Sequence, residues 1–198
     1  AKWICAPAAS DSLLLRKEFL VKTNFLRALA HVTGLGHYEM SLNGAKVGHD
    51  LLSPGWTDYN DTILYDTHDI TGQLHHGANA VGLTLGNGMY HVERRNRFAK
   101  FTGSFGPLRA VLHLRLEYED GSVEFAGTNP GWRTHAGPIT YSSIYGGEDH
   151  DARLEPRGWD TAGFDDRTWA PAVPVIRLED RLRGHSVSAD AIREIEAH

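Results

Sequence analysis

The chain has 198 residues, of which 41% are hydrophobic and 23% are charged, with a formal net charge of −5. This composition excludes an intrinsically disordered chain, and the length is that of one domain with a substantial core. No run of about 18 apolar residues occurs, which predicts no membrane partner, and the mildly acidic charge predicts no nucleic-acid partner.

Short strands are predicted from the start of the chain. The single cysteine, Cys5, cannot form an internal disulfide and indicates no compartment; we expect it to be a small buried residue of the first strand. Residues 13–21 form an apolar run, residues 25–33 alternate imperfectly, and residues 37–42 alternate strictly. Asn43-Gly44 follows as a strong hairpin signal, because both turn positions need positive φ.

The remainder of the chain continues this pattern. Further strands are predicted over residues 62–67, 80–85, 108–118, 123–126 and 173–178, with short helices near 69–74 and 189–196. Many short antiparallel strands separated by turns are typical of a sandwich or barrel. We therefore predict one all-β domain, an antiparallel β-sandwich over residues 1–175. Residues 176–198 are expected to form a linker or the first strand of a following domain.

One connection is longer than the others. Residues 86–107 contain four glycines but no long apolar run, and a connection of this length inside a compact domain is usually functional. It carries Arg94, Arg95 and Arg97, and a guanidinium group can bind a carboxylate through two hydrogen bonds. The segment predicts either recognition of an acidic sugar or a solvated, charged loop.

Three stretches of the sequence, in order along the chain, carry a resemblance to a known family. They are residues 32–59, which include Pro54-Gly55-Trp56; residues 85–90, Leu-Gly-Asn-Gly-Met-Tyr; and residues 144–169, which end on Trp169. Together they resemble the N-terminal β-sandwich module of bacterial α-L-rhamnosidases, in the glycoside hydrolase family with an (α/α)6 catalytic barrel. The resemblance covers roughly residues 25 to 175.

The resemblance implies a galactose-binding-like jelly roll that packs against a catalytic barrel of the same polypeptide. The parent enzyme would hydrolyse terminal α-L-rhamnosyl residues of an oligo- or polysaccharide, with its catalytic carboxylates in the barrel. We therefore expect no catalytic residue in this chain and no required cofactor, although some relatives bind rhamnose through calcium. Two alternatives stay open: the module of a related polysaccharide lyase that cleaves rhamnose–glucuronate linkages, or a purely structural domain that supports the barrel.

The second stretch departs from the family pattern. Relatives often carry Gly-Asp-Gly-Trp-Tyr where this chain has Gly86-Asn87-Gly88-Met89-Tyr90, so an aromatic side chain that could stack on a sugar is missing. Asn87 and Tyr90 remain predicted carbohydrate-binding residues.

A short polar segment predicts a sugar or calcium site. Asp58, Asn60 and Asp61 place three oxygen-bearing side chains within four residues, and calcium prefers oxygen ligands. Such an ion could also hold two neighbouring sugar hydroxyls, whereas a simple turn would use the same residues. Nearby, Trp56 is predicted to offer an aromatic face to a pyranose, although aromatic residues more often lie in a core.

Glu148, Asp149 and Asp151 form an acidic patch. Paired carboxylates perform glycoside hydrolysis, but successive strand residues point to opposite faces, so Glu148 and Asp149 make a poor pair. The resemblance also places catalysis elsewhere. We expect these residues to have a structural or interdomain role, with Asp151 or Glu148 pairing with Arg153 or contacting the neighbouring domain.

Overall fold

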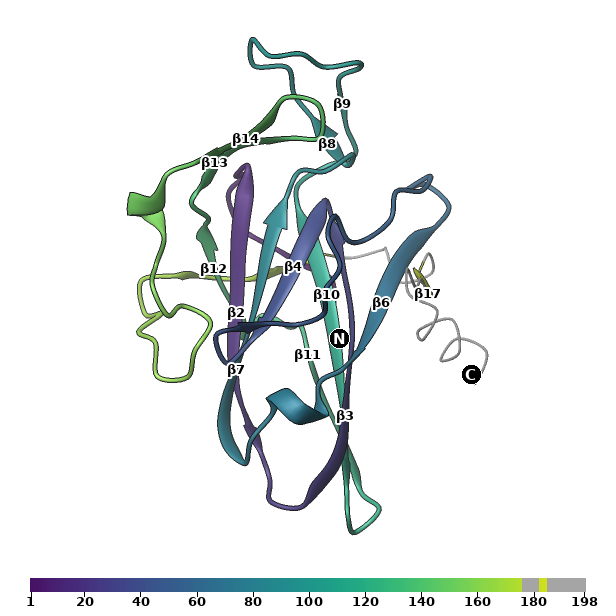
Figure 1. Ribbon diagram of the computed structural model, residues 1–198, viewed down its shortest axis with the longest axis vertical. Helices are drawn as coiled ribbons and strands as arrows, with labels where there is room; N and C mark the ends of the chain where they lie inside the picture. The colour runs from purple at the N-terminus through teal and green to yellow at the C-terminus, as the bar shows by residue number, and fades with distance from the viewer. Residues whose placement is uncertain (176–181, 185–198) are drawn as a thin grey trace.

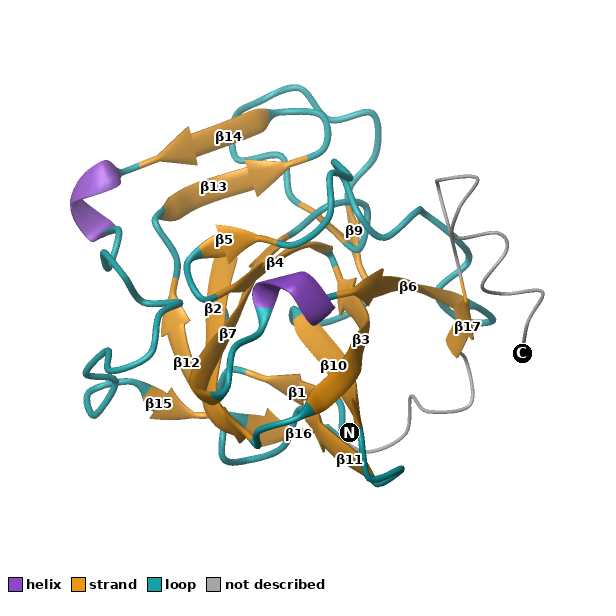
Figure 2. Ribbon diagram, turned by 60° about the horizontal axis from the view of Figure 1, so that its bottom comes forward, coloured by secondary structure: helices purple, strands orange, loops and turns teal. Residues whose placement is uncertain are grey.

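The computed structural model describes residues 1–175 and 182–184, and its two larger sheets face each other as a sandwich (Figures 1 and 2). The first sheet has the order β16-β1-β10-β3-β6-β17, and β11 also pairs with β10. Its strands are β1 (Ile4–Cys5), β3 (Phe25–Leu35), β6 (Ile63–Asp69), β10 (Arg109–Tyr118), β11 (Val123–Gly127), β16 (Val173–Pro174) and β17 (Leu182–Gly184). Only β17, which runs parallel to β6, departs from antiparallel pairing among the described strands.

The second sheet has the order β15-β12-β2-β7-β4-β5. Its strands are β2 (Ser12–Val21), β4 (His37–Leu42), β5 (Ala45–Lys46), β7 (Gly77–Gly86), β12 (Arg133–Ala136) and β15 (Ala170–Pro171). Two small sheets pair β8 (His91–Val92) with β9 (Gly103–Ser104), and β13 (Ile139–Ser143) with β14 (Gly147–His150). Two single-turn helices, η1 (Thr71–Gln73) and η2 (Ala152–Leu154), complete the described part, and neither has the length to cross a membrane.

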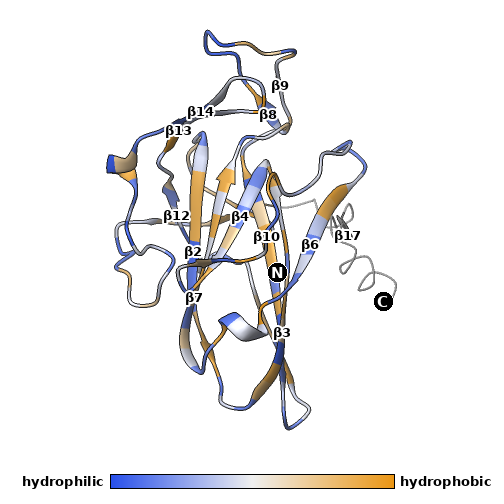
Figure 3. Ribbon diagram, in the orientation of Figure 1, coloured by the Kyte–Doolittle hydropathy of each residue, from blue (hydrophilic) through white to orange (hydrophobic). Residues whose placement is uncertain are grey.

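Strict alternation of side chains builds the core between the sheets. Along β10, every second residue from Ala110 to Leu116 is buried, while the residues between them are half-buried. The opposite sheet contributes Leu13, Leu15 and Leu83 to the same core. Figure 3 shows the resulting hydrophobic stretches along the strands. Each fully buried leucine stabilises the fold by about 1.5–3 kcal/mol, so the facing sides of the two sheets hold the sandwich together.

A polar contact also joins the two sheets inside the core. The hydroxyl of Tyr38 on β4 donates a hydrogen bond of 2.6 Å to the carboxylate of Asp66 on β6, and both side chains are buried. Burial and the neighbouring carboxylate raise the pKa of Tyr38, so it stays protonated as the donor.

The predicted all-β antiparallel sandwich is confirmed. Asn43 and Gly44 have φ values of 53° and 83°, as the predicted hairpin turn requires, and η1 lies within the predicted helical segment 69–74. Cys5 lies in β1 but is only half-buried.

The end of the chain is described only in part. Residues 182–184 pair with β6 and extend the first sheet, and the assignment of residues 176–198 to a linker or to the first strand of a following domain stays a prediction. The predicted strand 173–178 is described only as β16, because residues 176–181 lie outside the described residues. The predicted helix 189–196 also lies outside them.

Candidate functional site

Most of the predicted site residues lie at one end of the sandwich, which we call the loop end. Strand β7 finishes there, and the β8–β9 and β13–β14 pairs project from it at the top of Figure 1. The connection between β5 and β6 reaches the same place, because the Tyr59 ring meets the rings of Tyr90 and Phe105 at centroid distances of 5.2 Å and 5.3 Å.

The loop end contains a pocket of about 350 Å³, called the loop-end pocket below. It is lined by Ala6, Ala8, Ala9, Ser10, Leu13, Asn87, His91, Ser104, Gly106, Pro107 and Leu108. Most of this wall is apolar. The polar side includes His91, whose Nδ1 lies 2.7 Å from the Ser104 hydroxyl and whose Nε2 lies 3.1 Å from Glu93. Apolar walls with a few fixed polar groups are typical of small-molecule sites.

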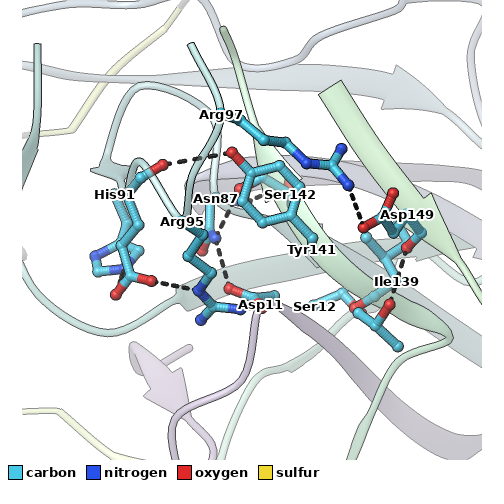
Figure 4. A network of polar contacts seen from close by, with 12 residues as sticks. Asp11, Ser12, Asn87, His91, Arg95, Arg97, Ile139, Tyr141, Ser142 and Asp149 are labelled. Carbon is cyan, nitrogen blue, oxygen red and sulfur yellow. Dashed lines mark hydrogen bonds and ion pairs between the residues drawn. The ribbon is translucent and has the colours of Figure 1, made fainter. Parts of the chain in front are cut away.

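Asn87 lines the pocket, but it is tied to the protein. Its side-chain amide donates to Asp11 Oδ1 at 3.2 Å and to the carbonyl of Ser142 at 3.0 Å, and the residue is 2% exposed (Figure 4). These bonds join the end of β7 to β13. Both amide hydrogens of Asn87 are therefore engaged in holding the fold, and its role in carbohydrate binding stays a prediction.

Tyr90, the other predicted sugar-binding residue of this stretch, lies in a second hydrophobic cluster with Trp3 and Tyr59. It is 3% exposed, stacks on Phe105 and donates its hydroxyl to the Phe105 carbonyl at 3.0 Å. No ring face is left for a sugar. Met89 belongs to the same cluster, so the departure from the family pattern changes a buried position.

Two of the three predicted arginines are clamped by carboxylates (Figure 4). Arg95 donates to Asp11 at 2.5 Å and to Glu93 at 2.6 Å, and its hydrogen bond is the main reason that the pKa of Glu93 lies below its usual value. Arg97 donates to Asp149 at 2.6 Å and lies 4.5 Å from the centroid of the Tyr141 ring. Arg95 and Arg97 therefore fasten their loop, whereas their role in binding a uronate stays a prediction.

Arg94 differs from its neighbours. Within the described part of the chain, the single hydrogen bond of its side chain goes to the Ala99 carbonyl at 3.5 Å, and no carboxylate pairs with it. Its guanidinium is exposed in the segment 93–102 between β8 and β9, which we call the finger.

The segment around Trp56 is exposed. Trp56 itself is 68% exposed, so its ring is accessible. Asp58 accepts the backbone N–H of Asn60 at 2.9 Å, and Asp61 accepts the hydroxyl of Thr62 at 2.8 Å, which are the bonds of a turn. One oxygen of each carboxylate remains outside these bonds. The described residues contain no group of three or more His, Cys, Asp and Glu side chains arranged to hold a metal ion.

The acidic patch is divided among separate contacts. Asp151 caps η2 and pairs with Arg153 through two bonds of 2.8 Å and 2.6 Å, as predicted, and this pairing lowers the pKa of Asp151. Asp149 holds Arg97, and Glu148 is exposed. Asp11, at the centre of the network, was not predicted, since its partners lie 76 and 84 residues away and no local pattern marks it.

Comparisons with known proteins agree with this fold. Residues 23–196 match the sequence model of the family described as "Alpha-L-rhamnosidase N-terminal domain". A curated α-L-rhamnosidase of Streptomyces avermitilis is 41% identical over 171 residues, which are 83% of this chain and 16% of that protein.

Solved structures give the same result. The native α-L-rhamnosidase of Aspergillus terreus superposes with a TM-score of 0.84 and 32% identity, over 93% of this chain and 22% of that one. The Streptomyces avermitilis α-L-rhamnosidase complexed with L-rhamnose has a TM-score of 0.79 and 38% identity, over 86% and 16% of the two chains. The chain thus spans about a fifth or less of the relatives that it matches. It belongs to the α-L-rhamnosidase N-terminal domain family.

Proposed function

We propose that this chain is a non-catalytic carbohydrate-binding domain of an enzyme that hydrolyses terminal α-L-rhamnosyl residues. The observation that carries the proposal is the loop-end pocket, whose volume of about 350 Å³ suits one sugar unit rather than a long chain. A rhamnosyl unit presents a methyl group as well as hydroxyls. The alanine and leucine side of the pocket would pack against the methyl group, while Ser104 and His91 would bond to hydroxyls.

The non-catalytic part of the proposal is supported by the pocket's chemistry. Glycoside hydrolysis uses two carboxyl groups about 5 to 9.5 Å apart on either side of the scissile bond. None of the described residues that line this pocket is an aspartate or a glutamate. Catalysis would then belong to another part of a longer polypeptide, and the 198-residue chain should release no p-nitrophenol from p-nitrophenyl α-L-rhamnoside. Release above the uncatalysed rate would contradict this proposal.

Calcium is a separate component of the proposal. Asp58 and Asp61 each retain one carboxylate oxygen outside the turn's hydrogen bonds, and the side-chain oxygen of Asn60 lies between them in sequence. These oxygens match calcium's preference, and water or sugar hydroxyls would complete its six to eight ligands. None of these residues lines the loop-end pocket, so this calcium-dependent contact would be a separate one, with the exposed ring of Trp56 facing the sugar there.

Isothermal titration calorimetry with L-rhamnose, in calcium chloride and in EDTA, tests both components. We expect L-rhamnose to give heat of binding in calcium chloride. The Ser104→Ala variant should bind L-rhamnose about tenfold more weakly, because one hydrogen bond to the sugar is lost. Ser122→Ala is the matched control, because Ser122 lies in the β10–β11 turn at the other end of the sandwich. Absence of heat in both solutions would refute the binding role and favour a structural domain. Equal affinity for L-rhamnose in calcium chloride and in EDTA would refute only the calcium component.

A further inference from the structure

The finger carries two cations that the structure leaves without an acidic partner. Arg94 and Lys100 are both exposed, and no carboxylate among the described residues pairs with either of them. Their neighbours Arg95 and Arg97 pair with carboxylates and hold the finger to Asp11 and the β13–β14 pair. Two kinds of cation are thus present, one that fixes the loop and one that faces solvent.

The same segment carries two exposed aromatic rings. Phe98 is 74% exposed and Phe101 is 40% exposed, although a buried location would be favoured for both. Both meet the ring of Tyr145 nearly edge-on, at centroid distances of 6.3 Å and 5.6 Å. Tyr145 therefore supports the two rings from one side, while much of their surface stays open to solvent.

Cations and rings lie close together along the finger. The Arg94 guanidinium lies 3.5 Å from the carbonyl of Ala99, which places it beside the chain between Phe98 and Lys100. A tight turn brings this about, since the N–H of Arg97 donates to the carbonyl of Arg94 at 2.8 Å. The turn needs positive φ at Arg95, which is 37° there and costs energy in a non-glycine residue. The ion pairs of Arg95 and Arg97 hold this conformation.

We propose that the finger is a second saccharide subsite, which takes an acidic sugar, a uronate, next to the rhamnosyl unit. A guanidinium binds a carboxylate through two charge-assisted hydrogen bonds, and an aromatic ring packs against the C–H face of a pyranose. Arg94 and Lys100 supply the first contact and Phe98 supplies the second. A protein partner fits less well, because a stable protein interface buries about 800 Å² on each side, well beyond two phenyl rings. The inference rests on the proposed function in that its ligand is a rhamnosyl saccharide.

A matched pair of disaccharides tests the inference on the 198-residue chain. One is α-L-rhamnosyl-D-glucuronate, and the other is its carboxyl-reduced form, α-L-rhamnosyl-D-glucose. Titration calorimetry should give about fivefold tighter binding for the acidic sugar, since an exposed charge contact contributes modestly. An Arg94→Ala/Lys100→Ala variant should bind both sugars equally. Arg167→Ala is the control, because Arg167 is an exposed arginine that pairs with Asp165 in a loop outside the finger.

The outcomes separate this inference from the proposed function. Equal binding of the two disaccharides by the unaltered chain would overturn the uronate subsite, leave rhamnosyl binding intact and favour a protein carboxylate as the partner of Arg94. Binding of the acidic disaccharide alone, lost in the double variant, would support the subsite and overturn the rhamnosyl pocket. Failure of both sugars to bind would overturn both proposals. If the Arg94→Ala/Lys100→Ala variant still binds the acidic disaccharide more tightly than the carboxyl-reduced one, the subsite is also overturned.

Discussion

Arg16 lies on β2 with only 1% of its side chain exposed, beneath the segment that connects η2 to β15. Its Nε donates to the carbonyl of Trp159 at 2.7 Å, and its Nη2 donates to the carbonyl of Thr161 at 3.1 Å. Glu18 and Asp166 complete its partners. A buried charge is tolerated only when it is paired in this way, so this one side chain fastens the whole segment to the second sheet.

Arg16→Met is expected to lower the free energy of unfolding by about 3 kcal/mol or more, because two carboxylates and two carbonyls lose the bonds that Arg16 donates to them. Urea denaturation followed by tryptophan fluorescence measures the loss. Arg153→Met removes an exposed arginine whose partner is close in sequence and should cost less than about 0.5 kcal/mol. Similar losses in the two variants would show that Arg16 does not fasten the segment.

The Arg16–Glu18 pair also predicts a pH dependence. The hydrogen bond from Arg16 is the main cause that lowers the pKa of Glu18 below its usual 4.5 in the folded chain. The stabilisation is therefore complete above pH 4.5 and is lost as the pH falls through the lower, folded value. Thermal unfolding between neutral and acidic pH should show a smaller acid-dependent loss in Arg16→Met than in the unaltered chain. Parallel curves would refute the coupling.

At the scale of elements, one residue lets the chain pass from one sheet to the other. Strand β3 ends at Leu35 in the first sheet and β4 begins at His37 in the second, so Gly36 alone makes the crossing. Its φ is +108°, and a Cβ added there would lie 2.1 Å from the carbonyl oxygen of Gly86. Both the backbone conformation and the close approach to β7 require glycine.

Gly36→Ala is therefore expected to destabilise the fold by about 3 kcal/mol, since unfavourable backbone strain of about 1–3 kcal/mol adds to the steric clash. Gly72→Ala is the matched control, because nothing lies within 4 Å of a Cβ at that position and its φ is ordinary. Gly72→Ala should leave the free energy of unfolding unchanged. Chemical denaturation of both variants measures this free energy, and equal values for Gly36→Ala and Gly72→Ala would mean that the crossing tolerates a side chain.

The finger is a second element whose order depends on a few contacts. Asp149→Asn weakens the bond to Arg97 without changing the size of the side chain. We expect trypsin to cleave after Arg94, Arg95 and Arg97 faster in this variant, while the melting temperature changes little because the pair is exposed. Asp151→Asn, which alters the neighbouring pair with Arg153, should leave cleavage of the finger unchanged. Unchanged cleavage in Asp149→Asn would contradict the clamp.

For the whole molecule, local patterns predicted the strands better than the site. Alternation along residues 108–118 requires only that one side of a strand be buried, which neighbouring residues already reveal. The clamp of Arg97 by Asp149 joins residues 52 positions apart, and it exists only because β13–β14 folds over the loop end. The burial of Tyr90 was not predicted, because it depends on Tyr59, which comes from a distant connection. Contacts between residues so far apart in the sequence are created by the topology of the fold, and no local sequence pattern predicts them.

The pairing of β17 with β6 bears on aggregation. Without a neighbour, an edge strand offers its backbone N–H and C=O groups to another molecule. In the structure, Leu182, Arg183 and Gly184 lie opposite Ile63, Leu64 and Tyr65 and cover part of that edge. A chain truncated after Val175 should therefore self-associate more than the 198-residue chain, which light scattering after size-exclusion chromatography would detect. If the truncated chain elutes as the same species at every concentration, the edge is protected in another way.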